Sequence, residues 1–189
     1  MVQKVFFLFQ LLFLLVVSCN SNQKNLDDLK TFKEDDKYFK AGLISLHFKI
    51  ETSPIPTVDS LFRNFVDTYN IPFNANGCPD GVYIGESPYD AYDYKHIIKI
   101  QIKDEKIISA DYNETHFNGS SKQEDSIYCK EMSVTGTTPA IAYPNMEKQL
   151  IEKQNMMEID GVSGASYSLY RFRYATMIAL MRAHIKQKN

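Results

Sequence analysis

His96–Glu114 reads HIIKIQIKDEKIISADYNE, and this stretch decides the fold class. Two runs rich in isoleucine, His96–Lys103 and Lys106–Tyr112, are separated only by Asp104-Glu105. Two such runs joined by a two-residue link are typical of a β-hairpin. The first run carries Ile98, Ile100 and Ile102 on one face, and the second sets Ile107, Ser109 and Asp111 against them. One apolar and one solvated face predict an antiparallel sheet with helices on one side.

The segments on either side of the hairpin supply the remaining elements. Asp80–Glu86 (DGVYIGE) predicts a short strand, in which Gly85 leaves room for another backbone to come close. Apolar spacing predicts a helix over Thr57–Asn70 and a longer one over Tyr167–Lys186. Further predictions are a strand at Leu43–Glu51, a strand or irregular extension at Ile127–Val134, a helix with Pro144 in its first turn, and a strand at Met156–Val162. The predicted fold class is α+β, an antiparallel β-sheet packed with helices, with a small N-terminal strand-helix extension at residues 36–75.

The composition is that of a folded protein without a polyanionic partner. Of the 189 residues, 44% are hydrophobic and 13% are aromatic, which is enough for one good core. The formal net charge is -2, and the chain has no basic block and no acidic tail. We therefore expect no nucleic-acid partner.

The first residues, MVQKVFFLFQLLFLLVVSC, differ in kind from the rest. Lys4 precedes an apolar run that is short for a membrane span and typical of a secretory signal. The ending VVSC resembles a bacterial lipobox, which implies acylation of Cys19 and anchoring through the lipid. We expect a lipoprotein signal peptide at 1–18, a polar tether at 19–35, and a place in the cell envelope, on the outer face of the cytoplasmic membrane or on the outer membrane. The alternative is an ordinary signal peptide in which Cys19 is incidental.

Two cysteines remain beyond this anchor, Cys78 and Cys129. Outside the cytoplasm such a pair is a candidate disulfide, and the alternative is two free thiols. No CxxC motif and no cluster of histidines accompanies them, so the sequence predicts no metal site.

Small and hydroxyl-bearing residues gather before the last predicted helix, in Asp160–Ser168 (DGVSGASYS). Gly161 and Gly164 permit backbone conformations or close approach that other residues forbid. Serine hydroxyls and the free amides of a helix start point the same way, which predicts an anion site. The alternative is a plain helix cap after a tight turn, since serine is a preferred cap.

A hydrolase is a poor interpretation of the same corner. A nucleophile elbow needs glycine two places before and two places after the serine, and around Ser163 the later place holds Ala165. SxxK and HExxH motifs are missing, and nothing in the local sequence pairs any of the four histidines with an acid.

Residues Asp80 to about Ala183 resemble the FMN-binding domain of the small flavin subunits of sodium-pumping quinone reductases and Rnf-type complexes. DGVYIGE resembles the family's DGxYxGx opening, and IIKIQIKDEKIISADYNET resembles its hairpin, with Glu105 in place of the usual glycine. The most specific passage is LIEKQNMMEIDGVSGAS, which resembles the family's stretch from Gln to Asp-x-x-Ser-Gly-Ala-Thr before a long helix. The resemblance implies an FMN-binding domain over residues 76–187.

In that family the last hydroxyl of the Ser-Gly-Ala-Thr motif carries FMN through a phosphoester bond. A dedicated flavin transferase makes the bond from FAD, with magnesium and release of AMP. The resemblance implies that Ser166 is the attachment residue here, with serine in place of threonine. The flavinylation motif and phosphate cradle would then consist of Asp160, Gly161, Ser163, Gly164 and Ala165.

The resemblance also makes Glu114 and Thr115 candidate contacts of the flavin ring. In many family members this Glu-Thr pair is followed by Pro-Gly-Leu-Gly, whereas here it is followed by His116-Phe117-Asn118-Gly119. The departure leaves the cover of the ring to Phe117 or to nearby tyrosines.

Together these features predict a membrane-anchored electron-transfer flavoprotein outside the cytoplasm, with FMN as its cofactor and unidentified redox donor and acceptor. It would be a carrier more than an enzyme with its own substrate. One alternative is a non-redox lipoprotein that kept the fold and binds a partner without flavin. Another is a flavin-dependent reductase of a small molecule.

Overall fold

The computed structural model describes residues 37–188, and the predicted signal peptide, the Cys19 lipid anchor and the tether lie outside them. The helices are α2 (Lys37–Thr52), α3 (Ile55–Tyr69), α4 (Ser126–Ser133), α5 (Pro139–Lys153) and α6 (Ser166–Lys188). The strands are β1 (Gly81–Glu86), β2 (Tyr94–Lys103) and β3 (Lys106–His116), joined as an antiparallel sheet in the order β1-β2-β3. Two short 3-10 turns are η2 (Lys122–Glu124) and η3 (Met156–Glu158). The predicted α+β fold class is confirmed.

The central hairpin forms as the sequence predicts. β2 and β3 are antiparallel, with Lys103 opposite Lys106. Asp104 and Glu105 both have positive φ, 51° and 58°, which is the conformation of the tight hairpin turn that suits twisted strands. The Asp104 amide donates to Asp80 Oδ1 at 2.8 Å, so the turn is also tied to the residue that precedes β1.

A β-bulge changes which residues of β3 face the helices. Ile102 pairs with Ile107, but Gln101 pairs with Ser109, so Ile108 is an extra residue. The expectation that Ile107, Ser109 and Asp111 share one face is therefore wrong: Ile107 is buried while the other two are exposed. Past the bulge, Tyr112 and Glu114 point into the core, because one inserted residue reverses the alternation.

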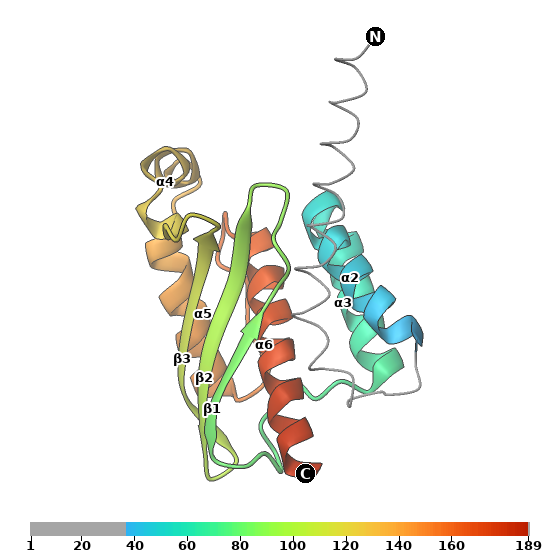
Figure 1. The fold of residues 1–189 in the computed structure, drawn as a ribbon. Coiled ribbons are helices and arrows are strands. Elements are labelled where there is room, and N and C mark those ends of the chain that lie inside the picture. The colour runs from blue at the N-terminus through green and yellow to red at the C-terminus, as the bar shows by residue number, and fades with distance from the viewer. Residues whose placement is uncertain (1–36, 189) are drawn as a thin grey trace, which may run out of the picture.

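Helix α6 forms the middle layer of the molecule. It packs on β1 and β2 on one side and on the α2–α3 pair on the other, and α5 covers β3 (Figure 1). Residues 168–181 of α6 are buried without interruption, as expected for a helix covered on all sides. Gly85 makes this contact close, because a Cβ there would lie 1.9 Å from the backbone oxygen of Ala175. The predicted close backbone approach is confirmed.

The predicted strand at Leu43–Glu51 is wrong, because these residues belong to helix α2. Their alternation is accidental, whereas Phe39, Leu43, Leu46 and Ile50 recur at helical spacing and are all buried. Packing against α3 and α6 selects that face. The helix predicted over 57–70 is present as α3, and both helices share one continuous core with the sheet and α6.

Two other predictions need correction. Ile127–Val134 lies mostly in helix α4, because the Asp125 carboxylate caps the amides of Ile127 and Tyr128. Met156–Val162 is a 3-10 turn and an extended segment instead of a strand. Its carbonyls at 156, 157 and 159 accept hydrogen bonds from the Arg173 side chain of α6, and not from a neighbouring strand.

Helix α5 also begins earlier than the sequence predicts. Its first residue is Pro139, so Pro144 lies inside the helix instead of in its first turn. Ala142, Tyr143, Met146 and Leu150 form the buried face, and this apolar spacing keeps the helix intact across the missing proline N–H. In residues 37–188 no helix is both long enough and apolar enough to cross a bilayer.

Candidate functional site

Ser166 is the first residue of α6, and its side chain is exposed. The amide of Leu169 donates to the carbonyl of Ala165 at 3.1 Å, which opens the ladder of the helix. The amides just before Leu169 therefore have no partner within the helix and point out of its positive end. The structure thus presents a hydroxyl and a helix N-terminus together.

Gly164 shapes this corner. Its φ is +82°, and a Cβ at this position would lie 2.0 Å from Thr135 Oγ1. The loop between α4 and α5 therefore lies directly against the turn before α6. The hydroxyl of Thr137 in the same loop is buried and makes no hydrogen bond. A residue with a side chain at 164 would push this loop away.

The rest of the motif is divided between solvent and core. Ser163 and Gly161 are exposed, and Ala165 is buried. The carboxylate of Asp160 accepts from Lys153 Nζ of α5 at 2.6 Å, and its pKa is lowered by that contact. The backbone amide of Asp160 also donates a hydrogen bond to Oε1 of Gln149 in α5 at 2.7 Å. Asp160 therefore fastens the corner to α5.

A cavity of about 440 Å³ opens beside the corner. Its walls carry four tyrosines, which are Tyr92, Tyr94, Tyr128 and Tyr167. Its charged lining residues are Lys122, Asp125, Glu131 and Arg171. Tyr167, which lines the cavity, is the residue that follows Ser166 in the chain, and Ser166 itself is not one of the lining residues. The size and aromatic lining are those of a small-molecule site.

Lys122 sits at the base of this cavity between two rings. Its Nζ lies 4.7 Å from the centre of the Tyr94 ring and 4.6 Å from that of Tyr128. The same Nζ donates to Glu114 Oε2 at 2.7 Å. The ion pair with Glu114 therefore fixes the position of Lys122, and the cation–π contacts of Lys122 hold the two cavity tyrosines in place.

Below the cavity lies a buried cluster of charges. Arg171 of α6 donates through Nη1 to Glu114 Oε2 at 3.3 Å and through Nε to Glu51 Oε1 at 2.9 Å. Burial raises the pKa of Glu114, but the charges of Arg171, His96 and Lys122 outweigh it and lower the pKa to about 2. Desolvation also acts on Glu51, but its contacts with His96, 3.5 Å away, and with Arg171 bring its pKa below the usual range. Both carboxylates are therefore ionised.

Two histidines complete the cluster. The ligand atoms of His47, Glu51 and His96 all lie within 4.8 Å of one another. Desolvation, and then the charge of His96, lower the pKa of His47 to about 3. The expectation that no histidine has an acid nearby is wrong, because His47 and Glu51 stand four residues apart on the helix that was predicted as a strand.

The structure separates the two candidate ring contacts. Glu114 is fully buried behind Lys122 and Arg171, which themselves line the cavity. Thr115 is half-buried and pairs with Ser121 through its backbone. Neither side chain lines the cavity. The sequence did not single out Lys122 or Arg171, and the two arginines among the aromatic residues at the start of the final helix, Arg171 and Arg173, were the available signal.

Cys78 and Cys129 are free thiols, so the candidate disulfide is not formed. Cys78 contacts His184 near the end of α6, with Sγ 3.1 Å from Nδ1, and burial raises its pKa to about 11. Cys129 lies in α4, where its Sγ is 3.4 Å from the carbonyl of Gln123. The two thiols have different neighbours in different parts of the fold.

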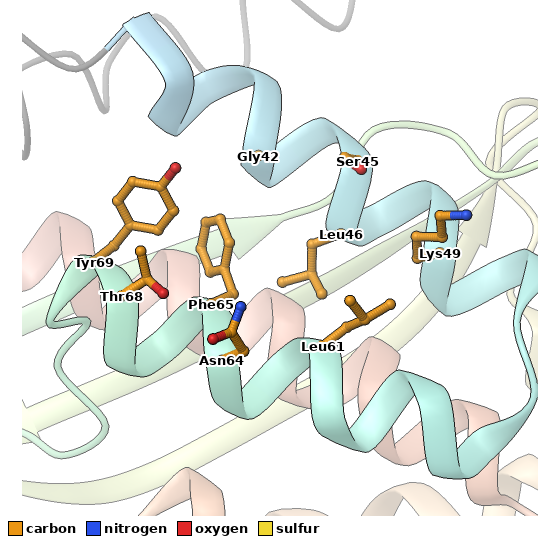
Figure 2. A pocket seen from close by; sticks show the side chains of 9 residues that line it. All are labelled: Gly42, Ser45, Leu46, Lys49, Leu61, Asn64, Phe65, Thr68 and Tyr69. Carbon is orange, nitrogen blue, oxygen red and sulfur yellow. The ribbon is translucent and has the colours of Figure 1, made fainter.

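A second hollow of about 230 Å³ lies between α2 and α3. Figure 2 shows Leu46 and Lys49 of α2 facing Leu61 and Phe65 of α3 across it. Lys49 is the one charged residue among the described residues that line it, which include no carboxylate and no histidine. We therefore assign no catalytic role to this hollow.

The fold and the site define an α+β domain with a tyrosine-walled cavity at the start of its last helix. No protein-family model matches the chain. The chain is 27% identical over 112 residues to a 15 kDa lipoprotein of Treponema pallidum (strain Nichols), a match that covers 58% of this chain and 79% of that protein. It is 36% identical to the CPE2226 protein of Clostridium perfringens, whose crystal structure superposes with a TM-score of 0.53 over 57% of this chain and 89% of that one. The chain belongs to the same protein family as CPE2226, and it has a lipoprotein among its distant homologues.

Proposed function

We propose that this protein is a lipid-anchored flavoprotein of the cell envelope, which carries FMN on Ser166 and relays electrons between two protein redox partners. One observation carries the proposal: Ser166 is exposed at the N-terminus of α6, and the next residue, Tyr167, lines a tyrosine-walled cavity of about 440 Å³. The similarity to a lipoprotein supports the envelope location.

The residues present fit the group. A phosphate ester on Ser166 would meet the free amides at the start of α6, where the dipole favours an anion. Because Gly164 has no side chain, the loop that contains Thr135 can pack directly against the corner. The cavity tyrosines offer flat, apolar faces of the kind that hold an aromatic ring system. FMN, when bound, supplies the reversible uptake and release of electrons.

The chain's own residues bind and orient. Lys153 and Gln149 hold Asp160 and so position the corner. Lys122 holds Tyr94 and Tyr128 through cation–π contacts. Glu114 would not contact the flavin ring directly, and it instead positions Lys122 and Arg171 through their hydrogen bonds. Loading requires the Ser166 oxygen to attack the FMN phosphorus of FAD, which breaks the pyrophosphate bond. AMP leaves with the serine proton, and a flavin transferase supplies the magnesium and the catalysis.

The test is the intact mass of the full-length protein co-expressed with a flavin transferase. We expect an increment of one FMN less one water, its loss in Ser166→Ala, and its retention in Ser166→Thr. Ser163→Ala is the matched control, because Ser163 is an exposed serine of the same corner. An increment that survives Ser166→Ala, or wild-type protein without any increment, contradicts the proposal. Colourless protein that also fails to bind free FMN would favour a binding module without flavin.

A further inference from the structure

His47 and Glu51 on α2 meet His96 on β2 inside the protein. Their ligand atoms lie within 4.8 Å of one another, and His96 Nε2 is 3.5 Å from Glu51 Oε1. Two ligands bound at about 2.0–2.1 Å to a tetrahedral zinc ion are about 3.3 Å apart. The separation between His96 and Glu51 therefore matches two ligands of one ion better than a direct hydrogen bond.

Three imidazole nitrogens of this cluster are buried without a hydrogen-bond partner in the part of the chain that the structure describes. His96 is 0% exposed and His47 is 6% exposed. Nε2 of His47 and both ring nitrogens of His96 have no hydrogen-bond partner in the described chain. A buried polar atom without a partner is unfavourable because its lost hydration is not replaced, and metal coordination is a way to use such nitrogens.

Charged groups lie next to two of these three side chains. The Nδ1 side of His96 faces Glu114 Oε2 at 3.8 Å, as in carboxylate–histidine–metal arrangements. Arg171 fixes the carboxylate of Glu51 through Nε at 2.9 Å. The hydrogen bond from Arg171 orients the carboxylate of Glu51 before an ion arrives.

We propose that His47, Glu51 and His96 form a site for a divalent transition-metal ion such as Zn²⁺, which joins α2 to the sheet. Two imidazoles and one carboxylate suit borderline metals, and three ligands leave a position open for a small ligand. The charges of Glu51 and Glu114 are already balanced by Arg171 and Lys122. The affinity of the site for a metal ion therefore comes mainly from its imidazole nitrogens. Mg²⁺ and Ca²⁺, which prefer oxygen ligands, are not expected to bind.

The experiment uses the full-length protein in detergent, purified without a histidine tag and stripped with a chelator. Titration with Zn²⁺ and Co²⁺ is followed by calorimetry and by the visible absorption of Co²⁺. We expect one ion per chain, no response to Mg²⁺ or Ca²⁺, and a raised Tm on binding. His47→Gln and His96→Gln each weaken binding by more than about tenfold. Glu51 stays in place, because its loss would also remove a partner of Arg171.

His116→Gln is the matched control, because that histidine lies against Tyr94 and Phe117 and outside the cluster. It should bind as the wild type does, and so should Ser166→Ala, which makes this test independent of flavin attachment. Wild-type protein that binds no Zn²⁺, or variants that bind it equally well, overturn the site. If a histidine variant does not fold, X-ray absorption of the Zn²⁺-loaded wild type decides. Imidazole ligands without sulfur support the site, and sulfur ligands overturn it.

Discussion

Arg171 on the last helix donates through its Nε to Oε1 of Glu51 on the first described helix, at 2.9 Å. A second bond joins its Nη2 to Oε2 of the same carboxylate, so the pair is bidentate. The two residues are 120 positions apart in the chain. The ion pair therefore ties the N-terminal helices to the helix that carries Ser166.

The first prediction concerns this pair. Arg171→Met should lower the free energy of unfolding by about 3–5 kcal/mol, because it leaves Glu51 and Glu114 as buried carboxylates without their shared partner. Urea denaturation measures the effect. Lys148→Ala, which removes an exposed pair with Glu152, is the control and should change stability by less than about 0.5 kcal/mol. Equal effects in the two variants would show that the buried network contributes little.

The second prediction compares two glycines. Gly85→Ala should cost about 3 kcal/mol or more, because its Cβ would overlap the backbone of α6 at Ala175, which cannot move without the helix. Gly161→Ala should be nearly neutral, because its Cβ would meet only Leu169 at 3.5 Å. Thermal unfolding of both variants provides the comparison. A stable Gly85→Ala protein would mean that β1 and α6 are not in backbone contact.

The third prediction concerns the cap of α4, which forms part of the cavity wall. Asp125 accepts from the amides of Tyr128 and Ile127 at 3.0 and 3.1 Å, and Asp125→Ala should cost about 0.5–2 kcal/mol at pH 7. The Tyr128 amide lowers the pKa of Asp125 below its ordinary 3.8. The stabilisation is therefore full above about pH 4 and is lost as the pH falls through the lower, folded-state pKa.

Denaturant unfolding of wild type and Asp125→Ala at about pH 7 and pH 3 measures this difference. It should shrink at the lower pH. Asp125→Asn is the matched variant, since its side-chain oxygen still accepts at pH 7 but carries no charge. The same loss in Asp125→Ala at both pH values would rule out a role for the charge.

The corner before α6 shows how far sequence reasoning reached into the site. Gly161 and Gly164 were recognisable from residue type and order, and Ser166 was singled out through the resemblance of its motif to the flavinylation sequence. The structure places the serine exposed at the first turn of the helix, with Gly164 at positive φ. The partners of that corner were not recognisable, because Thr135 and Lys153 come from other segments.

Helix α2 shows why some of the site was missed. LISLHFKIE alternates as a strand does, and only packing against α3 and α6 makes it a helix. Once it is helical, His47 and Glu51 fall one turn apart and face His96. A local pattern of nine residues cannot report a contact made with residues far along the chain.

The sequence by itself determined the hairpin and the long final helix, because these follow from residue spacing and turn chemistry over short ranges. Only the tertiary structure decided that α2 is a helix, that a bulge in β3 turns Glu114 inward, and that Cys78 and Cys129 remain apart. It also decided that charges from α2, β3, η2 and α6 meet under the cavity. Burial, and with it the need to satisfy each buried charge, depends on the whole fold and not on any one segment.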